Sequence, residues 1–284
     1  MKIGMKQFIV LIFSNIFLFL FFIPILTINV KAGGPSAEEI AEGMFYCMDF
    51  KAGALSSGEV SGNEFSEEHL RQAALLIRPT CVQIQIGREV GSGSITSITE
   101  DYIYILTAAH VVKDMENAGA DENSYVVFYN GVVAVPEYVG KSDDRDLAVV
   151  KVATTDIEPY DLINLREVTF FDDADKDISE NDSVVFSMES GSVVDPDINQ
   201  KYHIHGSGTD IAESFVYGTV LKKDVLVTDF GYNMIYVKCN AQHGMSGAGV
   251  FDMKGRYVGL LAGGSDNKEM VAVKLHDVMD FLMD

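Results

Sequence analysis

The chain has 284 residues, of which 48% are hydrophobic and 22% charged, a composition typical of a folded globular protein rather than a disordered one. Asp and Glu (42) outnumber Lys and Arg (21), so the formal net charge is -21 and most of the surface would repel a polyanion. We therefore exclude nucleic-acid binding. Cys47, Cys81 and Cys239 are too few for a disulfide-stapled scaffold, and their odd number leaves at least one outside any intramolecular disulfide.

The amino terminus has the pattern of a targeting segment. Residues 8–28 carry no charge, follow Lys2 and Lys6, and lead to the small residue Ala32. A basic start, an apolar middle and a small-residue exit predict a secretory signal peptide over residues 1–32, which places the rest of the chain outside the cytoplasm. The alternative is an uncleaved membrane anchor, because about 20 apolar residues can span a bilayer. The helix-breaking Pro24 favours the cleaved form.

Residues 33–78 are predicted to form a helical appendage. Ser36 and Glu39 have the spacing of a capping box, which marks the start of a short helix. A second helical pattern runs over 67–78, and we expect Pro79 to end it. The appendage could pack on the following domain, assist oligomerisation or be removed, and its sequence leaves these alternatives and the oligomeric state open.

From Cys81 onward, short runs rich in Val, Ile and Tyr predict an all-β domain. Residues 82–86 alternate apolar and polar side chains, as expected of a strand with one buried face. Asn130-Gly131 between 124–129 and 132–135 predicts a two-residue hairpin turn, because both residues tolerate positive φ. Further strands are predicted at residues 102–106, 147–152, 184–188, 217–221, 234–238, 249–251 and 257–262, and a closing helix at 274–283.

Three segments of this domain carry a candidate catalytic set. His110 ends the run Leu106–Val112, Asp146 stands at the start of a strand, and Ser246 lies among glycines in Gly244–Gly247. A serine hydroxyl needs a base in hydrogen-bond reach to become a nucleophile, and histidine suits that role near neutral pH. A carboxylate can orient the imidazole, and glycines allow backbone N–H groups to converge on an oxyanion.

These segments resemble the motifs of trypsin/chymotrypsin-like serine proteases, in the same His, Asp, Ser order. Gly91-Ser92-Gly93-Ser94, the run Asp146–Val152 and the run Gly255–Leu260 are most similar to those of bacterial HtrA/Deg-type members. The resemblance implies a chymotrypsin-like double β-barrel over residues 79–284, with short N-terminal helices and a C-terminal helix. It also implies a secreted serine endopeptidase that needs no cofactor or metal and acts on protein or peptide substrates.

The same resemblance assigns roles to individual residues. His110, Asp146 and Ser246 would form the catalytic triad, and the N–H groups of Gly244 and Ser246 would form the oxyanion hole. The substrate pocket would be lined by Asn240, Ala262 and Gly264. His243, which precedes the serine loop, is a further candidate for the pocket, with an exposed loop residue as the alternative. Because no acidic residue is among them, we expect cleavage after an uncharged, small to medium side chain.

Two departures from the family pattern surround the serine. Met245 stands where digestive trypsins carry an Asp that pairs with a newly cut amino terminus, so activation by that salt bridge is excluded. Ala248 adds a methyl group where the family usually has glycine, and we expect it to be tolerated. A non-catalytic binding protein on the same fold is therefore the competing hypothesis, and an esterase with the same triad is a third.

Two other segments offer metal ligands, and for both we prefer a non-functional interpretation. His203 and His205 could share one strand face and bind zinc, but a polar strand face is the simpler explanation. The acidic run 172–177 lacks the glycine and the terminal Glu of a calcium-binding EF-hand, so we interpret it as a solvated loop.

Overall fold

The computed structural model describes residues 73–74, 76–87, 89–115, 124–170, 178–187, 215–239, 244–265 and 269–283. All of them belong to one compact unit, Gly33–Asp284. The predicted signal peptide, the capping box at Ser36, His203, His205 and the acidic run 172–177 lie outside the described residues. In the described part, no helix is long and apolar enough to cross a membrane.

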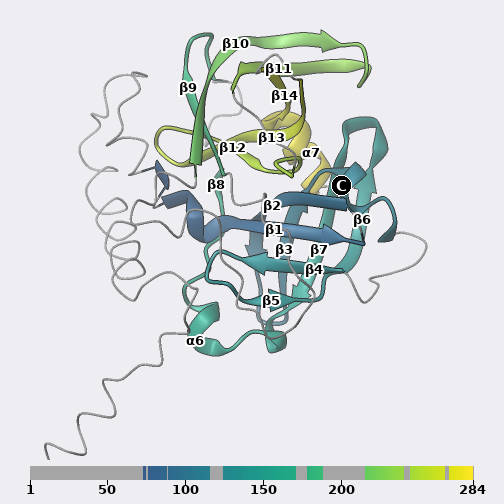
Figure 1. Cartoon of the computed structure of the whole chain (residues 1–284), viewed down its shortest axis with the longest axis vertical. Helices are drawn as coiled ribbons and strands as arrows, with labels where there is room; N and C mark the ends of the chain where they lie inside the picture. Colours follow the sequence, from purple (N-terminus) through teal and green to yellow (C-terminus); the bar gives the residue numbers. More distant parts are fainter. Residues whose placement is uncertain are drawn as a thin grey trace, which may run out of the picture. The chain divides into compact units, whose positions relative to one another are not determined.

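The first half of the domain is a seven-stranded antiparallel sheet in the order β5-β4-β1-β2-β3-β7-β6. It curls into a half-barrel, drawn in blue and teal in Figure 1. Its strands are β1 (Cys81–Ile86), β2 (Glu89–Ile98), β3 (Tyr102–Thr107), β4 (Tyr125–Phe128), β5 (Val133–Ala134), β6 (Glu137–Ser142) and β7 (Leu147–Ala153).

The second half is a sheet in the order β12-β9-β10-β11-β14-β13-β8, which the additional pairing of β12 with β13 closes into a barrel. The short β8 pairs in parallel with β13. Its strands are β8 (Thr169–Phe170), β9 (Ser183–Ser187), β10 (Phe215–Val227), β11 (Tyr232–Lys238), β12 (Gly249–Asp252), β13 (Arg256–Ser265) and β14 (Glu269–Lys274). The predicted chymotrypsin-like double barrel is therefore confirmed.

Helical segments are short and lie between the strands or at the end of the chain. The four-residue α6 (Pro159–Leu162) follows the first sheet, and α7 (Leu275–Met283) confirms the predicted closing helix. The 3-10 turns are η2 (Arg78–Thr80), η3 (Ala109–Val112), η4 (Asp143–Arg145) and η5 (Thr154–Asp156). Residues 73–74 and 76–77 are helical, as predicted, and the helix passes at Arg78 into η2, which contains Pro79 because a 3-10 turn tolerates proline near its start.

Several local predictions need correction. The hairpin at Asn130 forms, but the Gly131 N–H donates to Phe128 O at 2.8 Å and only Gly131 has positive φ, at 80°. The turn is therefore centred one residue earlier than the predicted Asn130-Gly131 pair. β1 is also buried on both faces, because Gln83 is enclosed along with the apolar residues. β2, β6, β8 and β14 were not predicted.

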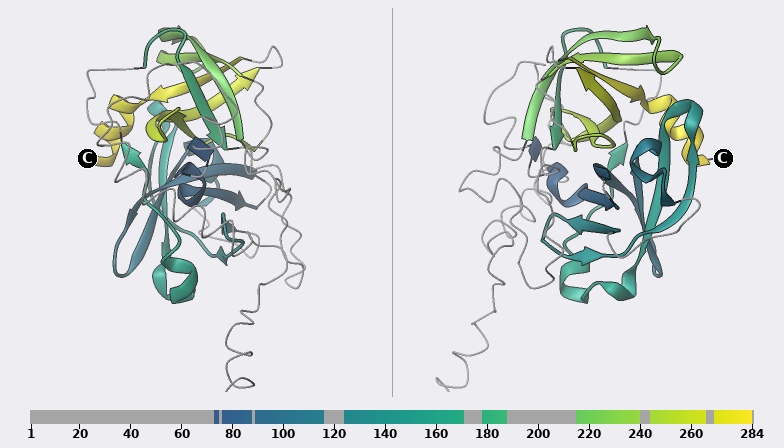
Figure 2. Two further views of the ribbon diagram at one scale, coloured as in Figure 1. Left: turned by 90° about the vertical axis from the view of Figure 1, so that its left-hand side faces the viewer. Right: turned by 45° about the vertical axis from the view of Figure 1, so that its right-hand side comes forward.

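The two halves share one hydrophobic core. Its largest cluster includes Ile84 and Leu106 of the first sheet together with Phe251 and Tyr257 of the second. The Phe251 and Tyr257 rings meet edge to face, with centroids 5.4 Å apart and an interplanar angle of 89°. Figure 2 shows the two sheets one above the other. β2 of the first sheet contacts β12 of the second. Residues 73, 74 and 77 of the predicted appendage also belong to this core.

Candidate active site

His110 is held out of the core by its neighbours. β3 ends at Thr107, and the next turn, η3, buries Ala109, Val111 and Val112. A 3-10 turn with three buried side chains presents the fourth outward, and the His110 side chain is 44% exposed. The apolar residues of the sequence run thus anchor the turn and leave the imidazole accessible.

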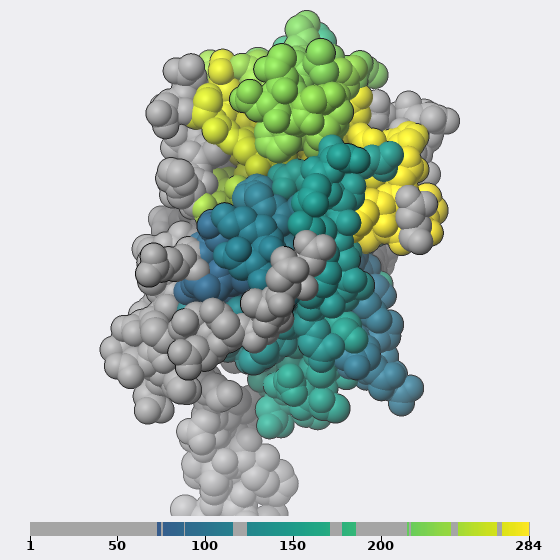
Figure 3. All heavy atoms as spheres, turned by 90° about the vertical axis from the view of Figure 1, so that its right-hand side faces the viewer, coloured from purple at the N-terminus to yellow at the C-terminus, as the bar shows by residue number. Residues whose placement is uncertain are grey.

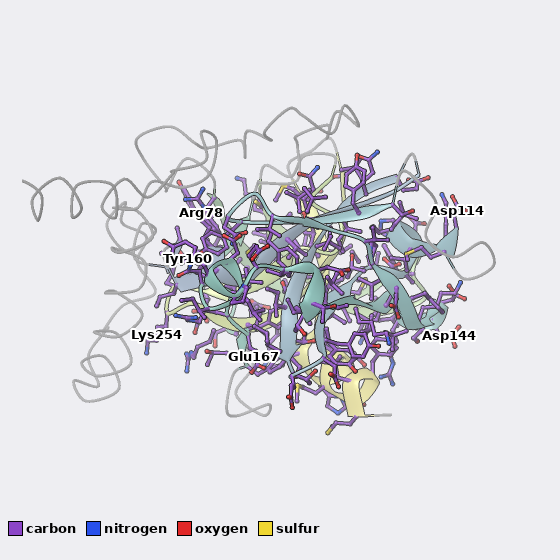
Figure 4. All side chains as sticks on the ribbon, turned by 90° about the horizontal axis from the view of Figure 1, so that it is seen from below. Arg78, Asp114, Asp144, Tyr160, Glu167 and Lys254 are labelled. Atoms are coloured by element: carbon purple, nitrogen blue, oxygen red, sulfur yellow. The ribbon has the colours of Figure 1, made fainter. Side chains whose placement is uncertain are left out.

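Strand pairing brings Asp146 to the same place. β3 and β7 are antiparallel, with Thr107 opposite Ala148. The residues that follow Thr107 and the residues that precede Ala148 therefore leave the sheet at the same end. Asp146 sits there after η4, in a left-handed conformation with φ 51° and ψ 43°. Figure 4 shows Asp114, which is close to His110 in the chain, and Asp144, which is close to Asp146, on the same side of the molecule.

Three hydrogen bonds join these two residues. Asp146 Oδ1 accepts from the His110 backbone N–H at 3.0 Å and lies 3.0 Å from Nδ1, while Oδ2 lies 2.9 Å from Nδ1. The carboxylate side chain is only 10% exposed. The carboxylate favours the tautomer in which Nδ1 carries the proton. Nε2, on the side of the ring away from Asp146, is then the basic nitrogen.

The loop around Ser246 is fixed by backbone hydrogen bonds to both sheets. Ser246 O accepts from the Ser92 N–H at 2.8 Å, and Ser92 Oγ donates to Gly244 O at 2.9 Å. From the other side, the Gly247 N–H donates to Leu261 O at 2.8 Å. β2 of the first sheet and β13 of the second therefore hold the loop between them.

Gly247 places this loop directly against the end of β3. Its φ is 85°, and a Cβ there would overlap the Ser92 carbonyl oxygen and Thr107 Oγ1 and lie 2.9 Å from Ala108 N. Thr107 Oγ1 donates in turn to Ser92 O at 2.7 Å. Only glycine fits this approach, so the Ser246-Gly247 backbone lies beside the strand end that leads to His110.

The two predicted oxyanion donors, the N–H groups of Gly244 and Ser246, belong to the described part of the serine loop. In the described part of the chain, the N–H groups of Gly244 and Ser246 donate to no protein acceptor. Gly244 has φ 88°, a conformation that favours glycine. Among the described residues no hydrogen bond joins Ser246 to His110, so the complete triad stays a prediction.

The unusual residues of the loop are accommodated by packing. Met245 and Ala248 are each 1% exposed and belong to the core of the second barrel. The Ala248 carbonyl accepts from the Leu261 N–H at 2.9 Å, which continues the pairing of the loop with β13. Met245 thus anchors the loop through apolar burial, at the position where trypsins use an ion pair.

The predicted pocket residues are only partly within the described structure. Asn240 and His243 lie outside it. Ala262 and Gly264 both belong to β13, where Ala262 is 2% exposed and Gly264 is exposed. Of the two, only Gly264 is open to a ligand, and the pocket stays a prediction.

Sequence reasoning missed four residues that support the site. Ser92 and Thr107 fix the serine loop, as described above. Tyr232 donates its hydroxyl proton to the carbonyl of Arg145, the residue before Asp146, at 2.8 Å. Ser92 lies in the Gly91–Ser94 motif that drew attention in the sequence, whereas Tyr232 and Arg145 carry no local pattern. Their roles depend on contacts between residues far apart in the chain.

The two buried cysteines do not form a disulfide with each other. Cys81 begins β1 and Cys239 follows β11, and both are buried. Cys47 lies outside the described residues. In the described part, no group of three or more His, Cys, Asp or Glu residues could hold a metal ion.

Sequence comparisons agree with the fold. A serine protease HtrA-like protein of Staphylococcus aureus (strain bovine RF122 / ET3-1) is 29% identical over 181 residues, which cover 61% of this chain and 20% of that protein. The corresponding protein of strain USA300 is 41% identical over 68 residues, covering 24% of this chain and 8% of the relative. The chain thus spans at most about a fifth of the length of these relatives.

Solved structures share the fold at low identity. A serine endoprotease from Yersinia pestis has a TM-score of 0.54 and 18% identity, covering 78% of this chain and 66% of that one. The HtrA-type protease AlgW, in a variant crystallised with a tripeptide, has a TM-score of 0.55 and 19% identity over 77% of this chain and 63% of its own.

A family model for the trypsin-like peptidase domain matches residues 91–260, more than half of the chain and the whole span from the Gly91 motif to β13. The matched span includes His110, Asp146 and Ser246. The chain therefore belongs to the trypsin-like peptidase domain family and is similar to HtrA-like serine proteases.

Proposed function

We propose that this chain is an extracytoplasmic serine endopeptidase that uses Ser246 as nucleophile, His110 as general base and acid, and Asp146 as the residue that orients the imidazole. The observation that carries the proposal is the Asp146 carboxylate, which is nearly buried and bonded to both the backbone and the ring of His110. A buried carboxylate with this geometry stabilises the imidazolium that proton transfer from the serine would create.

The reaction would proceed through an acyl-enzyme. Ser246 Oγ attacks the scissile carbonyl carbon while its proton moves to Nε2 of His110. The tetrahedral intermediate collapses, the C–N bond breaks, and His110 returns the proton to the leaving amine. A water molecule, deprotonated by His110, then cleaves the ester to Ser246 and restores the enzyme.

The N–H groups of Gly244 and Ser246 are available to stabilise an oxyanion. In the described part of the chain, the N–H groups of Gly244 and Ser246 have no protein acceptor, although Met245 between them is buried. Amides in a loop fixed by β2 and β13 need no reorganisation when charge develops on the substrate oxygen. We propose that these two N–H groups form the oxyanion hole.

Substrate preference is proposed from the residues around β13. Gly264 is exposed, and none of Asn240, His243, Ala262 and Gly264 carries a negative charge that would hold a Lys or Arg side chain. An uncharged, small to medium side chain before the scissile bond fits this set best. Secretion is proposed from the apolar segment that follows Lys2 and Lys6.

Digestion of a peptide library by the full-length chain tests this function, with Ser246→Ala as the control. We expect cleavage by the wild type only, after uncharged residues, and hydrolysis of both a peptide amide and the matching ester. Cleavage mainly after basic or acidic residues would refute the proposed specificity. Hydrolysis of the ester alone would favour an esterase, and no hydrolysis by a folded sample would favour a non-catalytic binding protein.

A further inference from the structure

The backbone conformation of Asp146 requires support from its surroundings. A non-glycine residue with φ 51° and ψ 43° lies in the left-handed region, which is unfavourable for a side chain with a Cβ. The one backbone bond that closes this turn, from the Asp146 N–H to Asp143 O, is long at 3.4 Å. In the described part of the chain, the carboxylate accepts hydrogen bonds from His110 alone. Its position is therefore decided largely by how residues 143–146 are held.

Tyr232 holds this segment from the second barrel. It begins β11, and its hydroxyl donates to the Arg145 carbonyl at 2.8 Å. The Tyr232 ring is itself kept in place by Phe230, which meets it edge to face with centroids 6.3 Å apart. The bond therefore ties the peptide that joins Arg145 to Asp146 to a different sheet.

The electrostatic surroundings keep the Tyr232 hydroxyl protonated. Burial raises the pKa of Tyr232 above its ordinary value, and the Asp146 and Asp277 carboxylates raise this pKa further, while Arg145 acts in the opposite direction. The hydrogen bond to the Arg145 carbonyl places the Tyr232 hydroxyl one residue from Asp146. A hydroxyl in this position remains a hydrogen-bond donor throughout the working pH range of the enzyme.

The side chain of Arg145 ties the same segment to the C-terminal helix. Arg145 Nη1 donates to Asp277 O at 3.3 Å, Nε lies 3.8 Å from Asp277 Oδ1, and Nη1 lies 3.7 Å from Asp280 Oδ2. Figure 3 shows the teal atoms of the first sheet directly against the yellow atoms of the C-terminal segment. Arg145 is thus fixed at its carbonyl by Tyr232 and at its guanidinium by α7.

We propose that Tyr232 and Arg145 are positioning residues that hold Asp146 in its left-handed conformation, so that its carboxylate meets both the backbone N–H and the ring Nδ1 of His110. This inference rests on the proposed function, because it assigns these residues to the support of the same His110–Asp146 pair. Tyr232 holds Asp146 through its hydrogen bond to the Arg145 main-chain carbonyl, and α7 holds it through the Arg145 side chain. Neither residue is assigned a contact with substrate.

The test is Tyr232→Phe in the full-length chain, which removes only the hydroxyl. Tyr160→Phe is the matched control, because Tyr160 is 55% exposed on α6 and lies at the opposite end of the view in Figure 4 from Asp144. We expect kcat to fall about 3- to 10-fold with KM within about twofold, the size of one lost hydrogen bond. The low-field proton resonance of His110 Nδ1–H should also shift or broaden.

Arg145→Met provides a second variant that keeps the carbonyl bonded to Tyr232 and removes the clamp to α7. We expect the same changes in kcat and in the Nδ1–H resonance, and a double variant whose loss is smaller than the product of the two single losses. If Tyr232→Phe and Arg145→Met both fold and have the same kcat and the same Nδ1–H resonance as the control Tyr160→Phe, the positioning role is wrong. A loss of kcat that merely tracks the folded fraction, with the resonance unchanged, also overturns it.

The resonance separates this inference from the proposed function, because it is recorded on the resting protein without turnover. A wild type that shows the resonance but cleaves no peptide contradicts the proposed endopeptidase. If Tyr232→Phe still shifts the resonance in that case, Tyr232 nonetheless positions the pair. If the wild type cleaves peptides and Tyr232→Phe leaves both the resonance and the cleavage rate unchanged, the positioning role is contradicted and the proposed endopeptidase activity is not.

Discussion

Asp146 Oδ1 accepts two hydrogen bonds from the same residue, one from the backbone N–H of His110 and one from its ring Nδ1, each at 3.0 Å. The backbone bond fixes where the carboxylate lies, and the ring bond fixes how the imidazole is turned. Both depend on the antiparallel pairing of β3 with β7, which ends beside them. The His110–Asp146 pair is therefore built at the end of two paired strands of the first sheet.

Asp146→Asn tests the orienting role of the carboxylate. An amide of the same shape can donate to Nδ1 and so favours the wrong tautomer of His110, which leaves no basic nitrogen for the serine. We expect kcat to fall on the order of 10³- to 10⁴-fold, with little change in the thermal midpoint. Steady-state kinetics checks this, and a decrease of less than about tenfold would show that Asp146 does not orient the base.

Gly247→Ala tests the close approach of the serine loop to β3. The new Cβ would overlap the Ser92 carbonyl and Thr107 Oγ1 in a backbone with φ 85°. Gly131→Ala is the matched control, because its φ is 80° and nothing lies within 4 Å of the added methyl group.

Gly131→Ala should cost about 1 kcal/mol, the penalty of the left-handed conformation alone. Gly247→Ala should cost several kcal/mol more and abolish peptide hydrolysis, because the loop must move. Denaturant unfolding measures the free-energy difference. Equal losses for the two variants would show that the loop is not packed as described.

Met245→Ala tests whether apolar burial anchors the loop. Met245 and Met270 are each 1% exposed in the core of the second barrel, so replacing either by Ala should destabilise the protein by about 2–5 kcal/mol. Only Met245 adjoins Ser246, so we expect kcat of the folded enzyme to fall in Met245→Ala and to stay near wild type in Met270→Ala. Equal kcat values for Met245→Ala and Met270→Ala would show that Met245 does not anchor the serine loop.

Much of the site could be predicted from sequence because its residues stand at strand ends. The buried runs before His110 and after Asp146 identify β3 and β7, and antiparallel pairing brings their ends together. The glycines around Ser246 likewise reflect a local backbone requirement, confirmed by the positive φ of Gly244 and Gly247.

The supporting contacts could not be predicted in this way. In β2, Gly91 is crowded by Val111 of η3 and by the Ser246 carbonyl, and Gly93 is crowded by β1 and β3. A segment with such glycines lacks the apolar pattern of a strand. The Tyr232 hydrogen bond joins residues 87 positions apart, and the Arg145 bond to Asp277 spans 132 positions. No local pattern in a single sequence specifies contacts of this range.

Alkaline pH should destabilise the protein through its buried tyrosines. Burial raises the pKa values of Tyr232 and Tyr257 above their ordinary value of 10.0. Below pH 10 both phenols are neutral in the folded and unfolded states. Above it the unfolded chain ionises first, so the free energy of unfolding should fall by up to about 1.4 kcal/mol per pH unit for the fully buried Tyr257, and by less for the partly buried Tyr232.

Tyr257→Phe isolates one of these contributions. The Tyr257 hydroxyl is buried and has no hydrogen-bond partner among the described residues, so its removal should leave stability at pH 7 unchanged or raised. The decline of stability above pH 10 should become shallower, while Tyr160→Phe should leave it as in wild type. A decline that is identical in all three proteins would show that Tyr257 ionises as freely in the folded state as in the unfolded chain.

The most direct measurement is the intact mass of the full-length chain after exposure to a fluorophosphonate, followed by peptide mapping of the modified residue. An activated serine beside an open oxyanion site should add one phosphonyl group, located on Ser246, and Ser246→Ala should remain unmodified. Asp146→Asn should react far more slowly than the wild type. Absence of labelling in a folded wild-type sample, or labelling that persists in Ser246→Ala, would contradict Ser246 as the nucleophile.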